Sequence, residues 1–277
     1  VDNPTSLISS EGQIQLAARP NDVSVIGGSG DDLIIAGKGN DSYDGGAGNN
    51  TVDFSKITAG LTVDLDKGLV TGGGNYTLSN IQHVIGTDYG DVLIGNSQNN
   101  HLQGGLGDDT LIGGGGNNIL NGGGGINTLN YQTAGSGVSV DLSSSQATDN
   151  GNGGTDQISN IQNVMGSQHD DLIIGDQNNN VLYGEDGDDI LLGMGGDNIL
   201  DGGAGVNTAS YVNSTSGISA DLTTNTVSNG FGGTDSLIDI QNIIGSDFDD
   251  QIVGGNGSSY IQAGAGNDRL IVGGNES

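Results

Sequence analysis

The chain has 277 residues, of which 55 are glycine and none is cysteine, and its 34 acidic residues against 5 basic ones give a formal net charge of −29. Disulfides and thiolate metal sites are therefore excluded, and nucleic acid is a poor partner because no basic patch can neutralise phosphates. Membrane insertion is not expected either, since no apolar run approaches the roughly 18 residues of a spanning segment.

A nine-residue unit, Gly-Gly-x-Gly-x-Asp/Asn-x-apolar-x, recurs sixteen times along the chain. Clear copies are GGSGDDLII at 27–35, GGLGDDTLI at 104–112 and GEDGDDILL at 184–192. The glycines favour a tight turn because they tolerate positive φ. The last three residues alternate around one apolar side chain, which predicts a short strand with that side chain inward. Each unit is therefore expected to form one turn and one strand.

The units fall into four blocks, which are separated by three similar inserts. The inserts contain GLTVDL at 60–65, GVSVDL at 137–142 and GISADL at 217–222, and their alternation predicts β-hairpins. In chain order we divide the sequence into an N-terminal segment (1–20), block 1 (21–53), a hairpin insert (54–85), block 2 (86–130), a second insert (131–165), block 3 (166–210), a third insert (211–244) and block 4 (245–274).

The repeat predicts an all-β fold. Two units make one 18-residue coil, so that strands 18 residues apart stack in parallel, and crossovers of this type are right-handed. We expect a right-handed parallel β-roll, or β-solenoid, in stacked blocks with β-hairpin inserts. Such a coil has a thin core, and its turns carry carboxylates that repel one another. Bound cations that bridge neighbouring turns would remedy both weaknesses.

The unit resembles the nonapeptide repeat of the RTX (repeats-in-toxin) family, and the resemblance extends over about residues 21–274. This resemblance implies several calcium ions held between stacked turns on the same flank of the coil. Main-chain carbonyls and the position-six carboxylate would be their ligands. It also implies export of the unfolded chain through a type I secretion channel.

Position six of the unit supplies the candidate calcium ligands, because turns on the same flank lie 18 residues apart and bring these residues together in pairs. The pairs expected to bind best are Asp91 with Asp109, Asp171 with Asp189, and Asp250 with Asp268. The mixed pairs, expected to bind less well, are Asp32 with Asn50, Asp109 with Asn127, and Asp189 with Asn207.

Two further groups complete the candidates. The amide pairs Asn100 with Asn118 and Asn180 with Asn198 should bind weakly or not at all, because affinity falls with ligand charge. Asp41 is a candidate on the other flank of block 1 and has no same-flank partner there. The competing interpretation is that these residues only form turns, which aspartate and asparagine do well.

Positions seven and nine of the unit face outward and are apolar mainly on alternate units, as at Val92, Ile94 and Ile112. Two interpretations compete for this outer surface. The one we favour is that hairpin strands such as 138–142 cover it. The other is that it serves assembly with further molecules.

The sequence shows no catalytic constellation. His83, His101 and His169 are scattered, and no Gly-x-Ser-x-Gly nucleophile motif occurs. We therefore expect no enzyme activity and no cofactor other than calcium. Ice binding is disfavoured, because the threonines form no regular ladder.

The expected function is that of a calcium-binding, secreted structural protein at the cell surface or outside the cell. An adhesin, sheath, surface-layer or fibre component that folds on binding extracellular calcium fits this description. The alternative is a non-catalytic RTX export and folding module of a larger secreted enzyme or toxin. End-to-end self-association is a further expectation, because a stacked coil has open ends. The segment 6–18 would then add a strand at the junction.

Overall fold

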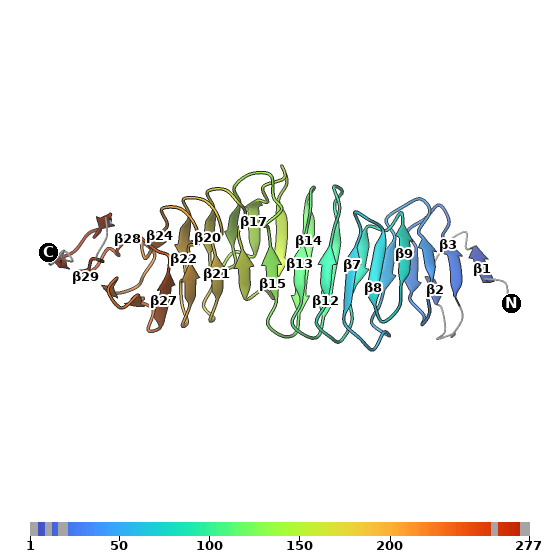
Figure 1. Ribbon diagram of the computed structural model, residues 1–277, viewed down its shortest axis with the longest axis horizontal. Coiled ribbons are helices and arrows are strands. Elements are labelled where there is room, and N and C mark those ends of the chain that lie inside the picture. The colour runs from blue at the N-terminus through green and yellow to red at the C-terminus, as the bar shows by residue number, and fades with distance from the viewer. Residues whose placement is uncertain (1–4, 9–12, 16–21, 256–259, 272–277) are drawn as a thin grey trace. The chain divides into compact units, whose positions relative to one another are not determined.

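The computed structural model describes residues 5–8, 13–15, 22–255 and 260–271, and these residues form strands and turns without any helix (Figure 1). Accordingly, this part of the chain contains no helix able to cross a membrane. Of the predicted segment 6–18, the structure describes only the two strands β1 and β2, and the remainder lies outside the described residues. The all-β prediction is confirmed.

The chain divides into two compact units, one built from residues 1–129 and 153–161 and the other from 130–152 and 162–277. Each unit consists of two sheets, and Figure 1 shows their strands as successive rungs joined by turns.

In the first unit, one sheet runs in the order β1 (Thr5–Ile8), β3 (Val23–Ile26), β5 (Ser42–Asp44), β9 (Tyr76–Ser79), β8 (Leu69–Gly72), β7 (Leu61–Asp64), β11 (Val92–Ile94), β13 (Thr110–Ile112) and β15 (Thr128–Asn130). The opposite sheet contains β2 (Gln13–Gln15), β4 (Leu33–Ile35), β6 (Thr51–Asp53), β10 (His83–Ile85), β12 (His101–Gly105), β14 (Asn118–Gly123) and β18 (Asp156–Ser159).

In the second unit, one sheet runs in the order β19 (Asn163–Met165), β21 (Val181–Tyr183), β23 (Ile199–Asp201), β27 (Thr234–Ile238), β26 (Thr226–Ser228), β25 (Ser219–Asp221), β29 (Gln251–Val253) and β31 (Arg269–Ile271). The opposite sheet contains β17 (Gln146–Asp149), β16 (Ser139–Asp141), β20 (Leu172–Ile174), β22 (Ile190–Leu192), β24 (Thr208–Ser210), β28 (Asn242–Ile244) and β30 (Ile261–Gln262).

Within a block, strands of one sheet pair in parallel with partners 18 residues apart, as Leu93 does with Leu111. The intervening strand β12 lies in the opposite sheet, so two units complete one coil, as the repeat predicts. Position-eight side chains fill the space between the sheets. All of them from Ile34 to Ile252 are 0% exposed, whereas Leu270 on the last described strand is 48% exposed. The predicted parallel β-roll is confirmed.

The hairpin inserts lie within the sheets, and the prediction that they cover an outer face is wrong. Strand β8 pairs antiparallel with both β7 and β9, while β9 continues the ladder from β5 and β7 leads it on to β11. The alternating apolar side chains of the inserts therefore point into the core, where Val63 and Val140 are fully buried. Pairing edge to edge satisfies main-chain hydrogen bonds that a covering hairpin would leave open.

Candidate calcium sites between stacked turns

The position-six side chain of one coil closes the turn of the coil before it. Oδ1 of Asp109 accepts a hydrogen bond of 2.8 Å from the main-chain N–H of Asp91. The same link joins Asp171 to Asp189 (2.8 Å), Asp250 to Asp268 (3.0 Å), Asp32 to Asn50 (2.9 Å), Asp109 to Asn127 (3.0 Å) and Asp189 to Asn207 (2.9 Å). It also joins Asn100 to Asn118 and Asn180 to Asn198, both at 2.9 Å. The predicted stacking of position-six residues at 18-residue spacing is confirmed.

Two of these carboxylates keep one oxygen without a partner although they are buried. Asp109 is 1% exposed and Asp189 is 0% exposed, and Oδ2 of each makes no hydrogen bond to the described residues. Oδ1 of Asp32 is buried and unpaired in the same way. Burying a carboxylate oxygen without a hydrogen-bond partner costs free energy, and a bound ligand at these atoms would remove that cost.

Glycine at position one leaves a space beside the unpaired Oδ2 of Asp109 and of Asp189. A main-chain carbonyl oxygen borders the same space. A Cβ placed on Gly104 would collide with Oδ2 of Asp109 and would lie 2.5 Å from the carbonyl oxygen of Gly122, one coil further on. A Cβ on Gly184 would collide with Oδ2 of Asp189 and lie 2.7 Å from the carbonyl oxygen of Gly202. A carboxylate and a carbonyl oxygen thus converge between two stacked turns. Oxygen donors of these two kinds suit calcium.

The electrostatics of both sites favour a cation. Burial raises the pKa of Asp109 to about 7, and the negative charges of Asp91 and Asp108 act in the same direction. Burial likewise raises the pKa of Asp189 to about 7, assisted by neighbouring aspartates. A divalent ion between the turns would favour the ionised carboxylates and cancel their mutual repulsion.

Side chains alone do not complete a site. Within the part of the chain that the structure describes, no three His, Cys, Asp or Glu residues lie close enough together to hold a metal ion. The ligand set therefore has to include main-chain carbonyls such as that of Gly122, which calcium accepts readily. With that addition, the residues present fit the ion.

The first position-six aspartate of blocks 2, 3 and 4 has partners that sequence reasoning missed. Oδ2 of Asp91 accepts from the N–H of Thr87 (2.6 Å), and its Oδ1 accepts from the N–H of Leu61 in the preceding insert (2.7 Å). The equivalent inserts donate from Val138 to Asp171 (2.7 Å) and from Ile218 to Asp250 (2.8 Å). The recurring hexapeptide of the inserts was the available signal.

The asparagine partners use both of their side-chain atoms. Besides accepting through Oδ1, Nδ2 of Asn50, Asn127 and Asn207 donates to the carbonyl oxygens of Asn80 (2.9 Å), Asn160 (3.0 Å) and Asp239 (3.2 Å), respectively. At these asparagines, the amide N–H pairs with a main-chain carbonyl oxygen of the next coil. At Asp109 a bound cation would pair with the equivalent carbonyl oxygen. These turns are closed without an ion.

The two remaining candidates differ from the buried pairs. Oδ1 of Asp41 accepts from the N–H of Val23 (2.8 Å) and its Oδ2 from the hydroxyl of Tyr43 (2.7 Å), so both oxygens are bonded. Asp268 is half-buried on the last described turn, where its Oδ1 bonds Asp250.

No curated protein matches the chain. Among solved structures, the extracellular lipase LipA from Serratia marcescens is similar at 18% sequence identity and a TM-score of 0.27, over 67% of this chain. The chain spans 38% of the length of that lipase.

A family model described as the RTX calcium-binding nonapeptide repeat (4 copies) matches residues 24–52, 85–120, 94–129, 165–200, 174–209 and 244–275. These segments comprise more than half of the sequence and coincide with the stacked turns described above. The chain therefore belongs to the RTX calcium-binding nonapeptide repeat family.

Proposed function

We propose that this chain is a secreted structural or cell-surface protein whose repeats fold when calcium ions bind between stacked turns. The observation that carries the proposal is the pair of buried, unpaired carboxylate oxygens on Asp109 and Asp189, each sharing a space with a main-chain carbonyl. In our proposal the chain itself has no catalytic role, and calcium is its only cofactor.

We rank the proposed ligands by the oxygens that they have free. Asp109 and Asp189 come first, followed by Asp32. Asp91, Asp171, Asp250 and Asp41 already accept hydrogen bonds at both oxygens and would contribute one only by sharing it. Asp268 accepts through Oδ1 and lies half-buried on the last described turn. Asn50, Asn127 and Asn207 would act chiefly by closing the turn beside the ion.

Charge and composition make folding depend on the ion. A chain with 55 glycines and a net charge of −29 loses much conformational entropy on folding and repels itself when compact. Each bound calcium cancels two charges and links two coils. Extracellular calcium modules bind at about 10⁻⁴–10⁻³ M, far above the calcium concentration inside cells. The proposed chain is therefore expanded inside the cell and folds outside.

A calcium titration of the chelator-treated chain, followed by far-ultraviolet circular dichroism, tests this function. The β-sheet signal is expected to develop at about 10⁻⁴–10⁻³ M calcium. Magnesium is the control and should be much less effective, because it demands a tighter octahedral site. A full β-sheet signal after exhaustive chelation would contradict the proposal.

End-to-end self-association belongs to the same proposal, because the terminal strands of a stacked coil carry main-chain groups that a second copy can pair with. Sedimentation velocity is expected to show larger species with calcium than with chelator. A calcium-loaded monomer at high protein concentration would remove this part. The alternative, an export and folding module of a larger secreted enzyme or toxin, uses the same calcium chemistry. A catalytic domain encoded in the same gene would distinguish it.

A further inference from the structure

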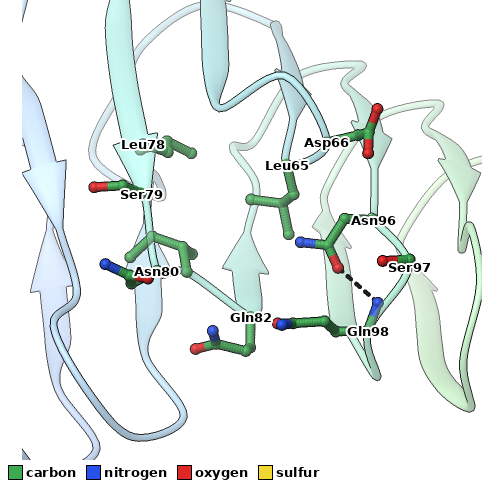
Figure 2. Close-up of a pocket in the computed structure, with 10 residues that line it drawn as sticks. Leu65, Asp66, Leu78, Ser79, Asn80, Gln82, Asn96, Ser97 and Gln98 are labelled. Atoms are coloured by element: carbon green, nitrogen blue, oxygen red, sulfur yellow. Dashed lines mark hydrogen bonds between the residues drawn. The ribbon is translucent and has the colours of Figure 1, made fainter.

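A polar pocket of about 300 Å³ lies in the first unit, between the first hairpin insert and the turn that follows β11 (Figure 2). Its walls come from the residues after β7, from residues 78–82, and from the turn at 96–98. Its volume lies at the lower end of the range of about 300–1,000 Å³ that is typical of small-molecule sites. The pocket is separate from the buried aspartates of the calcium sites.

Three amide side chains in this pocket are each held by one hydrogen bond and keep their other polar atom free. Oε1 of Gln82 accepts from the N–H of Asn50 (2.8 Å), and Oδ1 of Asn96 accepts from the N–H of Gln98 (2.9 Å). Nδ2 of Asn80 donates to a carboxylate oxygen of Asp44 (2.7 Å).

The free atoms are Nε2 of Gln82, Nδ2 of Asn96 and Oδ1 of Asn80, none of which makes a hydrogen bond to the described residues. Two donors and one acceptor are thus oriented in advance. Pre-orientation lowers the entropy lost when a ligand binds.

The rest of the lining restricts the class of ligand. Leu65, Leu78 and Ile81 are buried and present little apolar surface to the pocket, whose lining is mainly polar. Exposed Ser97 and Gln98 lie on one wall, and Asp66 supplies one carboxylate (Figure 2). No lysine, arginine or histidine lines the pocket, so nothing there would neutralise an anion. The net charge of −29 further disfavours anionic ligands.

We propose that this pocket binds a neutral saccharide. Each sugar hydroxyl both donates and accepts a hydrogen bond, which matches a lining that includes free amide donors and a free amide acceptor. This site goes beyond the calcium-dependent folding proposed above, because the folded chain would bind a second ligand besides calcium.

The test uses the calcium-loaded full chain and a panel of free sugars: maltose, cellobiose, lactose and N,N′-diacetylchitobiose as neutral probes, and glucuronic acid as the anionic control. Saturation-transfer NMR followed by calorimetry is expected to detect at least one neutral sugar and not glucuronic acid. Asn96→Ala removes one of the free donors and should weaken that binding about threefold to tenfold, the effect of one lost hydrogen bond. Asn99→Ala makes the same change on the same turn, at an exposed residue that does not line the pocket, and should leave binding unchanged.

Ser97→Tyr provides a second variant, because a bulky side chain on the wall fills the pocket and should abolish binding. Circular dichroism in calcium is expected to be the same for all three variants and the parent chain. Failure of calcium-dependent folding is therefore distinguishable from failure of sugar binding. The proposal is overturned if no neutral sugar of the panel binds, if glucuronic acid binds equally well, or if binding survives in both pocket variants.

Discussion

The main-chain N–H of Asp91 and Oδ1 of Asp109 lie 2.8 Å apart across two successive coils. One carboxylate oxygen thereby fixes the turn of the preceding coil, while the other, buried Oδ2, is left for a cation. Turn geometry and ion binding are coupled through a single side chain. The predictions below separate these two roles.

Asp109→Asn should make the fold less dependent on calcium. The amide can keep the Oδ1 contact to Asp91 and donate Nδ2 to the carbonyl of Gly122, as Asn127 does to Asn160. We expect urea unfolding in chelator to show a stability gain of about 1 kcal/mol, and calcium affinity to fall. Asp88→Asn, an equal charge change on an exposed residue of a neighbouring turn, serves as the control. Equal effects of the two substitutions would argue against a specific role for Asp109.

The chelator-treated chain should become more stable as the pH falls. Burial raises the folded-state pKa of Asp109 and Asp189 to about 7 from the ordinary aspartate value of 3.8, so the folded state binds more protons than the unfolded state between these values. This contribution is fully present below about pH 4 and is lost as the pH rises through about 7. Calorimetry in chelator at pH 5 and pH 8 should give the higher melting temperature at pH 5.

Calcium should change that pH dependence. Protons compete with the ion for the same carboxylates, so calcium affinity is expected to fall as the pH drops through about 7. A melting temperature in chelator that is higher at pH 8 than at pH 5 would show that these carboxylates do not titrate as their burial implies.

Gly104→Ala should disrupt a calcium site directly. The added methyl group would collide with Oδ2 of Asp109 and crowd the carbonyl of Gly122. We expect a loss of about 1–3 kcal/mol in calcium, the usual cost of overpacking, measured by urea unfolding. Gly135→Ala is the matched control, because its methyl group would lie 3.6 Å from the nearest atom, the carbonyl oxygen of Gly151. The prediction fails if both alanines behave alike.

Substitution of glycine for Glu185 or for Met194 should stabilise the folded chain. Glu185 and Met194 stand at position two of their units, where glycine is usual, and their φ angles are 77° and 63°. Left-handed backbone costs a residue with a Cβ about 1–2 kcal/mol, partly offset by the greater flexibility of glycine when unfolded. Glu185→Gly and Met194→Gly are each expected to raise the unfolding free energy by about 1 kcal/mol in calcium. Glu185→Ala keeps a Cβ and should give no such gain.

The nine-residue register was sufficient to predict the coil, because each unit carries its own turn, strand and inward side chain. The position of Leu111 behind Leu93 and of Asp109 behind Asp91 follows from that register alone. The path of the inserts was not predictable in this way. Alternation in GVSVDL specifies a strand but not its neighbour, and the pairing of Val140 with Ile173 is set by main-chain groups that every residue type shares.

For the candidate calcium sites too, the sequence predicted some features and not others. Sequence spacing predicted which position-six residues stack. The recurring hexapeptide marks where Leu61 lies, but its contact with Asp91 is made by a main-chain N–H, so the sequence does not specify the partner. Likewise, the orientation of the Gln82 amide depends on Asn50, in an earlier block. Such details depend on three-dimensional neighbours rather than on local pattern.

Each hairpin precedes in sequence the block whose first aspartate it caps, as with Leu61 and Asp91, Val138 and Asp171, and Ile218 and Asp250. If the chain folds from its N-terminal end, each hairpin is in place before the repeats that stack on it. Assembly can proceed coil by coil in the order of emergence, and the position-six side chain of each new coil closes the turn of the coil before it.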